Sequence, residues 1–564
     1  MMVYYLPAQT LTTIFERTNG KQTATYFECI DFYKSLAKSF STVKILTGDT
    51  TDAGYPLHVI LFSSDKTFNP NKWHEQHKVV LLINNGIHPG EPDGIDASMM
   101  FLRDLAEGKI KAPAYVVIAV IPVYNIGGCL NRNNFSRVNQ NGPESYGFRG
   151  NAENLDLNRD FIKADSKNAF AFEKIFQQLN PDIFIDNHVS DGADYQHTLT
   201  LLTTQHNKLE GEIGDFLHDV FEPALYKSMQ AKKWEMCPYV NFEESSLRNG
   251  WDAFYDPPRY STGYAGLFET IAFMPETHML KPYADRVKSV YAFMQTVAEE
   301  ASTFSNAILA KRMASLNAIK QQKEFPLRWK VDSSKFDNID FKGYDTSMKI
   351  SEVTGLPRYY YDHSKPFEKQ IKFYNYFSPS VSTQKPKAYV IPRGWHEVID
   401  RLKLNAVIMH QLKNDTTINV EYYLVTDYKS LAKAYEKHHP NYDIKTETKT
   451  GSIRFFKGDY IIYTGQFSDR YIVEALEPLA DDSYFSWNFF DAVLQRKEFY
   501  SDYRWEDVAA DYIKQHPEVK SELEEREKTD SVFAKSAEQQ LYFVYTHSPY
   551  SEPGYMRIPV FKVE

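Results

Sequence analysis

The chain has 564 residues, of which 43% are hydrophobic and 24% charged, as in ordinary globular proteins. This length exceeds what a single core accommodates and predicts two or three domains. The net charge of −10 argues against nucleic acid as the main partner. No apolar run approaches the roughly 20 residues that span a membrane. Three scattered cysteines are too few for a disulfide framework.

Two further features of composition bear on structure and location. The aromatic share is 15%, with 39 Tyr and 38 Phe, which favours extensive β structure and surfaces that face peptides or sugars. The N-terminal MMVYYLPA has neither the basic start nor the apolar core of a signal peptide. Localisation stays open between the periplasm, export and the cytoplasm.

The N-terminal part predicts an α/β fold. Residues 1–50 are interpreted as a lead-in with a helix at 27–40. Residues 51–316 alternate strand and helix patterns, which predicts a mixed, largely parallel central sheet with helices on both faces. One long helix over 285–316 is expected to close this domain.

The composition changes after residue 316. Residues 317–384 alternate polar and apolar side chains and predict a β-rich connecting region. Residues 385–564 predict an α/β accessory domain, so the C-terminal extension as a whole is α+β or β-rich. Its expected elements are strands at 385–392, 406–412, 453–465 and 542–548, a helix from residue 395, and a charged helix at 518–531. This half is expected to pack on the first domain, bind substrate or mediate homo-oligomer formation.

Polar residues follow two apolar, β-branched runs. KVVLLINN (78–85) leads to His88 and Glu91, and DIFID (182–186) leads to His188. Two imidazoles and one carboxylate from neighbouring strand ends are a set that holds catalytic zinc, with a fourth position left for water. Such a water approaches neutral pKa and becomes a nucleophile.

The spacing of the first pair indicates a turn. Pro89 and Gly90 separate His88 from Glu91, so the pair does not lie along one continuous helix. Residues 93–105 then show apolar side chains at helical spacing, which places Glu91 near a helix start. Taken alone, a His-x-x-Glu pair is also typical of an ordinary polar turn.

The segment 131–166 is dense in Arg and Asn and contains DLNRDF. A guanidinium grips a carboxylate through two parallel hydrogen bonds. Arg149, Asn158 and Arg159 are therefore candidates to hold the anionic end of a substrate. The alternative is a solvated loop whose arginines form surface ion pairs.

Four features follow one another along the chain: H-x-x-E, then R…D-L-N-R, then a strand that ends in His, and finally a late Glu. With this ordered set, the sequence resembles the zinc carboxypeptidase (metallocarboxypeptidase) family over roughly residues 50–310. RVNQNGPESYGFRG and ETHMLKPY resemble the bacterial branch with a long C-terminal extension. The resemblance implies a carboxypeptidase-like fold with one Zn²⁺ per chain.

The resemblance also implies roles for residues. His88, Glu91 and His188 would bind the metal, and Asp156 would orient a ligating histidine. Arg149, Asn158 and Arg159 match the positions that bind the terminal carboxylate and polarise the scissile carbonyl. Arg137 competes with Arg149 for that match.

A late glutamate acts as general base in the family. Glu276 follows the strand-like IAFMP and is our choice, while Glu269 precedes this run and is the competitor. Glu276 would take a proton from water and return it to the leaving amine, with Arg149 beside the oxyanion. Of the two tyrosines that could close over the substrate, Tyr264 is assigned to substrate binding and Tyr260 is the alternative.

The expected function is hydrolysis of the C-terminal amide bond of a peptide or peptidoglycan fragment that carries a free carboxylate. Two alternatives stay open: a deacylase of N-acyl amino acids on the same fold, and a non-catalytic protein that binds peptides or cell walls. The full set of site residues favours an enzyme over a binding protein.

Other histidines are interpreted as structural. His74 and His77 are assigned to a polar loop, and His438 is assigned, with its neighbour, to a helix end before Pro440. His197 is expected to be a satisfied structural residue.

Overall fold

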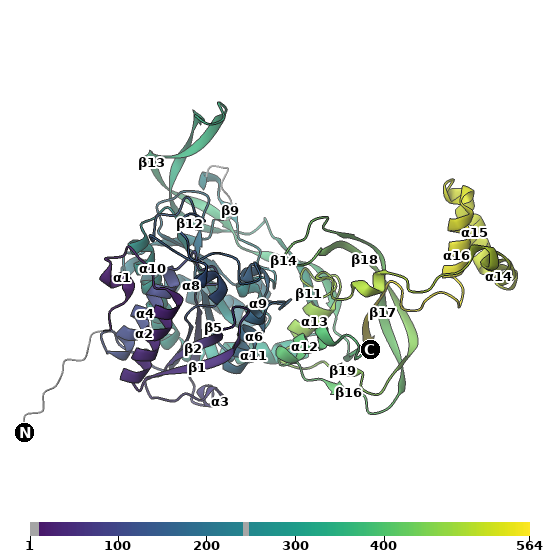
Figure 1. Cartoon of the computed structure of the whole chain (residues 1–564), viewed down its shortest axis with the longest axis horizontal. Coiled ribbons are helices and arrows are strands. Elements are labelled where there is room, and N and C mark those ends of the chain that lie inside the picture. Colours follow the sequence, from purple (N-terminus) through teal and green to yellow (C-terminus); the bar gives the residue numbers. More distant parts are fainter. Residues whose placement is uncertain (1–10, 241–246) are drawn as a thin grey trace, which may run out of the picture.

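The computed structural model describes residues 11–240 and 247–564, and a nine-stranded sheet forms the centre of their N-terminal half (Figure 1). The order is β1-β2-β4-β3-β5-β10-β7-β8, and β6 pairs with β10. The strands are β1 (Val43–Thr50), β2 (Pro56–Phe62), β3 (Val79–Asn84), β4 (Val116–Ile121), β5 (Ile183–Asp186), β6 (His188–Ser190), β7 (Leu199–Thr203), β8 (Met236–Pro238) and β10 (Ile271–His278).

The sheet is mixed, as expected. The central strands β4, β3, β5 and β10 run parallel to one another. The pairs β1–β2, β2–β4 and β7–β10 are antiparallel, and β7–β8 is parallel. Because the central strands are parallel, their carboxyl ends meet at one edge, where open α/β sheets collect functional groups. Strand β1 lies inside the region interpreted as a lead-in, and it is an integral part of the sheet.

The central strands are apolar on both faces. In β3 the alternate residues Val79, Leu81 and Ile83 enter one core, and Val80 and Leu82 enter another. This period of two explains why the strand reads as a continuous apolar run rather than as an alternating one.

Helices cover both faces of the sheet (Figure 1). One layer contains α2 (Tyr26–Ser39), α4 (Asp93–Ala106) and α10 (Tyr283–Thr303). The other contains α6 (Lys167–Leu179) and α9 (Ser261–Gly266). The remaining helices of this half are α1 (Ile14–Arg17), α3 (Pro70–Trp73), α5 (Ile126–Leu130), α7 (Glu212–Phe216), α8 (Glu222–Ala231) and α11 (Ser305–Gln321).

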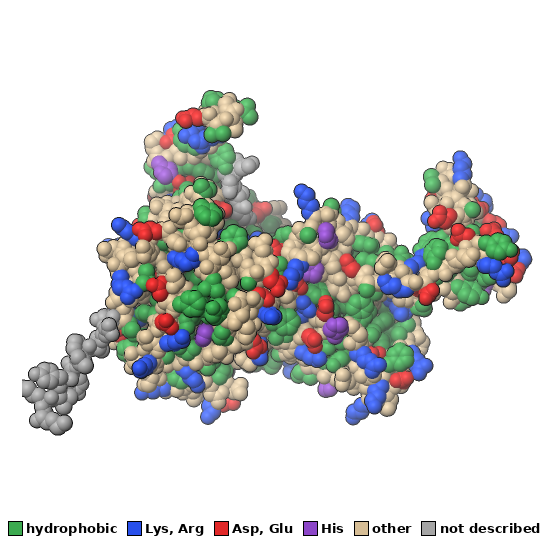
Figure 2. All heavy atoms as spheres, in the orientation of Figure 1, with side chains coloured by type: hydrophobic (Ala, Val, Ile, Leu, Met, Phe, Trp, Pro, Cys, Tyr) green, Lys and Arg blue, Asp and Glu red, His purple; other side chains and the backbone are tan. Residues whose placement is uncertain are grey.

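Two small sheets follow. Strand β11 (Glu324–Val331) pairs with β14 (Phe377–Gln384). The long hairpin β12 (Asp337–Ile350) and β13 (Pro357–Tyr374) joins β9 (Trp251–Asp252). The tip of this hairpin projects from the body, and its hydrophobic side chains are exposed (Figure 2).

The C-terminal part is an α+β unit with an antiparallel sheet ordered β16-β19-β15-β20-β17-β18. Its elements are β15 (Ala388–Ile391), α12 (His396–Leu404), β16 (His410–Gln411), β17 (Thr416–Ser430), β18 (Asn441–Phe455), β19 (Tyr460–Tyr463), α13 (Asp469–Leu476) and β20 (Arg557–Val563). Residues of α12 and α13 share one hydrophobic core with α6 and α9. The two halves are therefore joined by a continuous apolar interior.

A helical unit projects from this sheet (Figures 1 and 2). It consists of α14 (Asp502–Gln515), α15 (Pro517–Thr529) and α16 (Ala537–Thr546). It has its own small core around Trp505, Phe533 and Phe543.

Several local predictions were wrong. The expected helix at 285–316 is divided into α10 and α11 at Phe304, which leaves helical geometry (φ −101°, ψ 15°). Residues 542–548 were expected as a strand, but they lie mostly in α16, which Ser536 caps. His438 lies in a tight turn rather than at a helix end. Only His410–Gln411 of the strand expected at 406–412 pairs.

No helix among the described residues is long and apolar enough to span a membrane.

Candidate metal centre and active site

Two strand ends bring the predicted metal ligands together. His88 follows β3, His188 begins β6, and Glu91 lies in the turn before α4. One ligand atom from each of these buried residues lies within 4.8 Å of the other two. Within residues 11–240 and 247–564, no other group of three His, Cys, Asp or Glu side chains is arranged to hold a metal.

The turn between the first two ligands is closely packed. The Glu91 N–H donates to the His88 carbonyl at 2.8 Å, as the Pro-Gly spacing indicates. A Cβ added at Gly94, in the first turn of α4, would lie 2.5 Å from Asn85 Oδ1 and 2.6 Å from Asn187 Cβ. Glycine therefore allows the start of α4 to approach the strand end that carries His188.

The two imidazoles are oriented by carboxylates. His88 Nε2 lies 2.9 Å from Asp156 Oδ1, and His188 Nε2 lies 3.0 Å from Asp186 Oδ2. Both Nδ1 atoms face Glu91, each 3.3 Å from one carboxylate oxygen. The Nδ1 atoms are therefore the ring nitrogens that could bind a metal, and His88 Nδ1 is buried and makes no hydrogen bond. Buried polar atoms need partners, so the residues present fit a bound metal.

Neighbouring charges set the protonation of Glu91 and His188. Burial alone would raise the pKa of Glu91, but the charges of His88 and Arg137 hold it well below its ordinary value. Burial would lower the pKa of His188, but the Asp186 carboxylate outweighs it and the pKa lies well above the usual range. Ionised Glu91 is the form that binds a cation.

Two arginines surround Glu91. Arg137 donates to Glu91 Oε1 at 2.8 Å and to the Val189 carbonyl at 3.1 Å. Arg149 Nε donates to Asp156 Oδ2 at 2.9 Å, and its Nη1 lies 3.6 Å from Glu91 Oε1. Since Arg149 is the more exposed of the two, it has the greater freedom to meet a substrate.

Asp156 links the predicted metal ligands to the predicted anion clamp, Asn158 and Arg159, which would hold a substrate carboxylate. It caps the 3₁₀ turn Leu157–Arg159, because its Oδ1 accepts the Asn158 N–H at 2.9 Å. Burial would raise the pKa of Asp156, but His88 and Arg149 hold it well below the usual range. The carboxylate is therefore ionised and fixes both His88 and the turn that carries Arg159.

Asn158 and Arg159, the residues predicted to hold a substrate carboxylate, both lie in this 3₁₀ turn. Asn158 Oδ1 accepts the Ser261 N–H at 3.3 Å, which ties the turn to the start of α9. The Arg159 guanidinium lies over the Tyr260 ring, 4.5 Å from its centroid. Such a cation–π contact holds the arginine fork in place without occupying all its donors.

Glu276 lies on β10 beside the ligands. It is the register partner of His188 on β6, and only 8% of its surface is exposed. Burial raises the pKa of Glu276 to about 8, and nearby Glu91 adds to the shift while His188 opposes it. A buried carboxyl whose pKa lies near neutrality is suited to accept and return a proton.

These residues share one cavity of about 350 Å³. Its lining contains the predicted ligands, arginines and base together with aromatic and apolar side chains: His88, Glu91, Arg137, Arg149, Asn158, Arg159, His188, Val189, Ser190, Asp191, Leu202, Tyr239, Phe254, Tyr260, Met274 and Glu276.

The tyrosine prediction needs correction. Tyr264 is fully buried in α9, its hydroxyl donates to Asn405 Oδ1 at 2.7 Å, and it does not line the cavity. Tyr264 lies within α9 and its ring belongs to the core beneath the helix, whereas Tyr260 precedes α9 as its N-cap and has extended backbone geometry (φ −92°, ψ 154°). Tyr260, the alternative in the sequence, lines the cavity.

Glu269, the competitor for the base, is built into the fold. Its carboxylate accepts from Ser315 Oγ at 2.6 Å and from the Glu210 N–H at 2.8 Å, and it lies 3.4 Å from Arg470 Nη1. It does not line the cavity.

The other histidines have structural partners. His197 Nδ1 lies 3.2 Å from the Glu235 carbonyl, and His278 Nε2 lies 2.9 Å from the Ala193 carbonyl. Burial lowers the pKa of each to about 4, so both are neutral at pH 7.

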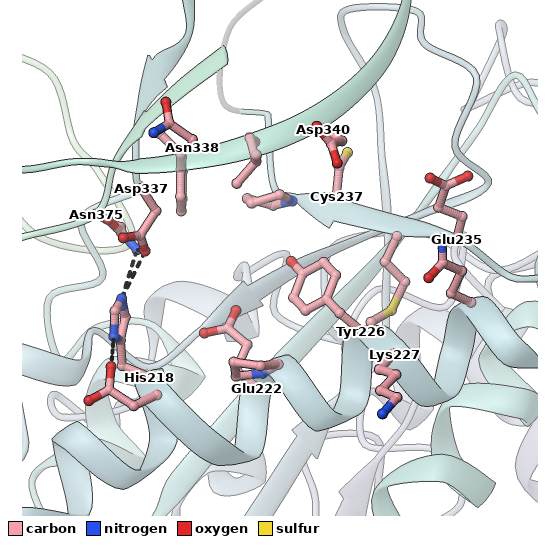
Figure 3. A pocket seen from close by; sticks show the side chains of 17 residues that line it. His218, Glu222, Tyr226, Lys227, Glu235, Cys237, Asp337, Asn338, Asp340 and Asn375 are labelled. Carbon is pink, nitrogen blue, oxygen red and sulfur yellow. Dashed lines mark hydrogen bonds and ion pairs between the residues drawn. The ribbon is translucent and has the colours of Figure 1, made fainter. Parts of the chain in front are cut away.

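A larger cavity lies elsewhere in the chain. It measures about 660 Å³ and is formed between α8 and β12, with Glu222, Tyr226 and Asp340 in its lining (Figure 3). None of the predicted ligands lines it. Its His218 is held between Asp219 at 2.6 Å and Asp337 at 2.8 Å.

Some contributors were not predicted. Asp186 orients His188, and the signal was present as an acidic residue two positions earlier in DNH. Tyr239 and Phe254 complete the cavity, but they lie in segments without a recognisable motif.

Fold and site together define an α/β protein with a buried His–Glu–His group in an arginine-lined cavity. No protein-family model matches the chain. It is 24% identical over 481 residues to Carboxypeptidase 2 of Trichophyton rubrum, covering 81% of this chain and 82% of the relative. It is 22% identical over 486 residues to Carboxypeptidase 2 of Trichophyton tonsurans, with the same coverage. These relatives support the resemblance to carboxypeptidases but are fungal, so they do not support the bacterial branch.

Among solved structures, the chain is similar to carboxypeptidase A of Helicoverpa armigera, with a TM-score of 0.38, 13% identity and coverage of 50% of this chain and 74% of the other. It is also similar to a metallo-carboxypeptidase of Burkholderia cenocepacia, with a TM-score of 0.37, 15% identity and coverage of 50% and 70%.

Proposed function

We propose that the protein is a zinc-dependent metallocarboxypeptidase that hydrolyses the C-terminal amide bond of a peptide. The observation that carries the proposal is the group of His88, Glu91 and His188, whose ligand atoms lie within 4.8 Å of one another. The same cavity holds a buried carboxyl and several arginines. Two histidines and a glutamate form one of the ligand sets of catalytic zinc in peptidases.

Binding of the substrate would depend on the clamp. Arg159 and Asn158 are the groups proposed to hold the terminal carboxylate, with Tyr260 packed against the guanidinium. Arg149 is proposed to approach the scissile carbonyl, because it lies between Asp156 and Glu91 at the ligand end of the cavity. A bidentate arginine would favour a free carboxylate over an amide.

Glu276 is the proposed general base. It would take a proton from the attacking water and return it to the leaving amine, while Arg149 stabilises the developing oxyanion. A bound zinc ion would supply Lewis acidity and lower the pKa of water. His88, Glu91 and His188 would hold that ion, one per chain.

The apolar part of the cavity suggests a substrate class. Leu202, Tyr239, Phe254 and Met274 contribute apolar and aromatic side chains to the lining of the cavity. Such side chains favour contact with apolar ligand groups. We therefore propose a preference for peptides that end in an apolar or aromatic residue, with peptidoglycan fragments and N-acyl amino acids as further substrates to assay.

The proposed base gives the test of function. Glu276→Gln keeps shape and hydrogen bonding, so folding and zinc content should stay at the wild-type level. Turnover of a peptide that ends in Phe should fall by about 10²–10⁴, the usual contribution of general acid–base catalysis. Glu269→Gln is the matched control for loss of a buried carboxyl outside the cavity. Normal turnover by the Glu276 variant, or no hydrolysis by zinc-loaded wild type, contradicts the proposal.

The clamp gives a second prediction. Arg159→Ala should raise KM for peptides with a free terminal carboxylate by about 10- to 100-fold, since hydrogen bonds to charged groups contribute about 1.5–3 kcal/mol. Amidated peptides should be affected much less. Arg454→Ala, on the exposed face of the C-terminal sheet, is the matched control. An equal loss on both kinds of peptide would assign Arg159 a structural role.

A further inference from the structure

A tight turn of the C-terminal half reaches the site. Tyr435 and His438 pair through two backbone hydrogen bonds, of 2.7 and 3.0 Å. The two residues between them, Glu436 and Lys437, have φ of +49° and +71°. Two-residue turns with positive φ at both positions strongly favour Asn and Gly, because a Cβ is disfavoured there. Glu436 and Lys437 therefore occupy positions whose backbone geometry disfavours long side chains, which indicates a role outside the turn.

The side chain of Glu436 contacts the loop that carries Asp156. Glu436 Oε2 accepts the N–H of Asp156 at 2.9 Å. Asp156 is the capping residue of its 3₁₀ turn, so its own amide has no partner within that turn. The next residue makes only an exposed ion pair: Lys437 Nζ lies 2.8 Å from Glu153 Oε2, with the two side chains 45% and 46% exposed. Such a pair contributes little to holding the loop, so the hydrogen bond of Glu436 is the contact that matters. The C-terminal half therefore holds the loop that carries the proposed clamp.

The turn itself is firmly anchored. The Tyr435 ring stacks on Trp487, with centroids 6.1 Å apart and planes at 17°. Trp487 is buried, and its Nε1 donates to Asp482 at 3.2 Å. Arg259 packs over the same indole at 5.0 Å and donates its backbone N–H to Asp482 at 2.8 Å. One C-terminal cluster thus fixes both the loop of Asp156 and the residue that precedes Tyr260.

We propose that Glu436 is a positioning residue, supplied by the C-terminal half, that fixes Asp156 and through it His88, Asn158 and Arg159. The inference rests on the proposed function, and it gives the C-terminal half a role at the site. The backbone N–H of Asp156 donates to Glu436. The Asp156 carboxylate lies 2.9 Å from His88 Nε2 and accepts from Arg149 Nε at 2.9 Å. Movement of its backbone would displace these contacts together.

The test uses the strained backbone to separate positioning from stability. Glu436→Gly removes the carboxylate but suits a positive φ, so folding is retained and Tm stays equal or rises. The matched control is Lys437→Gly, which relieves the same strain one residue further on. Glu436→Gln keeps an oxygen acceptor for the Asp156 amide. All variants are made in the full-length chain.

The expected outcome is a loss of about tenfold in kcat/KM for Glu436→Gly on peptides with a free carboxylate, comparable to removal of groups that orient metal ligands. The loss should appear in KM as well as kcat, because Arg159 moves with Asp156. Lys437→Gly and Glu436→Gln should stay close to wild type. Equal kcat/KM for Glu436→Gly and Lys437→Gly overturns the proposal. A loss in Glu436→Gln as large as in Glu436→Gly overturns the hydrogen-bond account.

The affinity for zinc provides a readout that does not depend on activity. Because Asp156 holds His88 Nε2 at 2.9 Å, Glu436→Gly should weaken zinc binding measured by competition with a chelator, and Lys437→Gly should not. If the wild type cleaves no peptide, the proposed function fails, yet this measurement still decides the role of Glu436. Unchanged zinc affinity in Glu436→Gly, with no peptide cleavage by the wild type, overturns the positioning role as well.

Discussion

Two buried groups beside the proposed metal position carry protons at neutral pH. Burial raises the pKa of Glu276 to about 8. His188 keeps its proton because the Asp186 carboxylate outweighs the cost of burial and raises its pKa well above the usual range. A divalent cation bound to His88, Glu91 and His188 reverses both preferences, since it needs a neutral imidazole and stabilises a nearby carboxylate.

Zinc binding should therefore release protons at pH 7. We expect wild type to release more protons than Glu276→Gln, which has no proton to lose at this position. The difference should fall by half at about pH 8, the pKa of Glu276, and disappear well above it, where Glu276 is already ionised. Calorimetric titration in buffers of different ionisation enthalpy measures the number of protons released. Equal release by both proteins at pH 7 would show that Glu276 is ionised before the metal binds.

At the scale of elements, the start of α4 is held against the ligand strands by a glycine. A Cβ at Gly94 would lie 2.5 Å from Asn85 Oδ1 and 2.6 Å from Asn187 Cβ, next to His188. Gly94→Ala should lower the free energy of unfolding by about 1–3 kcal/mol, as overpacking does, and weaken zinc binding. Thermal denaturation with and without zinc measures both effects.

The control for this substitution lies in α9. A Cβ at Gly266 would meet only Thr204 Cγ2, at an ordinary 3.4 Å. Gly266→Ala should leave stability unchanged or raise it by about 0.5–1 kcal/mol, as expected in a helix. Similar destabilisation by both variants would mean that the close packing at α4 is not what Gly94 provides.

Element types were predictable where a pattern was long or doubly buried. Strands β3 and β5 and helices α2, α4 and α15 follow from apolar runs and helical spacing, and the structure has them within a few residues of the expected ranges. The aromatic run at 542–548 misled, because its β propensity was outweighed by AEQQL before it and by packing against Trp505.

The candidate site was predictable as far as local motifs reach. His88 and His188 follow the parallel strands β3 and β5, whose ends lie together, and Glu91 lies in the turn after His88. Tyr260 and Tyr264 could not be distinguished, because α9 is too short for its buried face to be read from the sequence. The contact of Glu436 with Asp156 joins residues 280 positions apart, and no local pattern encodes it.

For the whole molecule, the C-terminal half contains two parts that differ in their attachment. The antiparallel sheet with α12 and α13 shares a core with the main domain, where Phe268 stacks on Tyr471 at 5.6 Å and Tyr264 bonds to Asn405 at 2.7 Å. The helical unit α14–α16 instead buries its own residues around Trp505. Only the first part is expected to be needed for folding and for the site.

Two truncations test this distinction. A chain that ends at residue 384 exposes the shared core and loses Glu436, so it should be insoluble or should lack a cooperative thermal transition. Excision of the helical unit should be tolerated, because its two ends lie together: the Lys497 N–H donates to Glu552 Oε1 at 2.8 Å.

Replacement of residues 499–550 by a Gly-Ser linker of about five residues spans this short gap. The shortened protein should keep the Tm of the main transition, its zinc content and its kcat/KM within about twofold of the full-length chain, since the removed helices have a separate core. Thermal denaturation, metal analysis and peptide hydrolysis measure these quantities on one preparation. A large fall in Tm would show that the helical unit supports the C-terminal sheet. Loss of activity at unchanged Tm would instead place the unit in substrate recognition, which its projection from the body does not suggest (Figure 1).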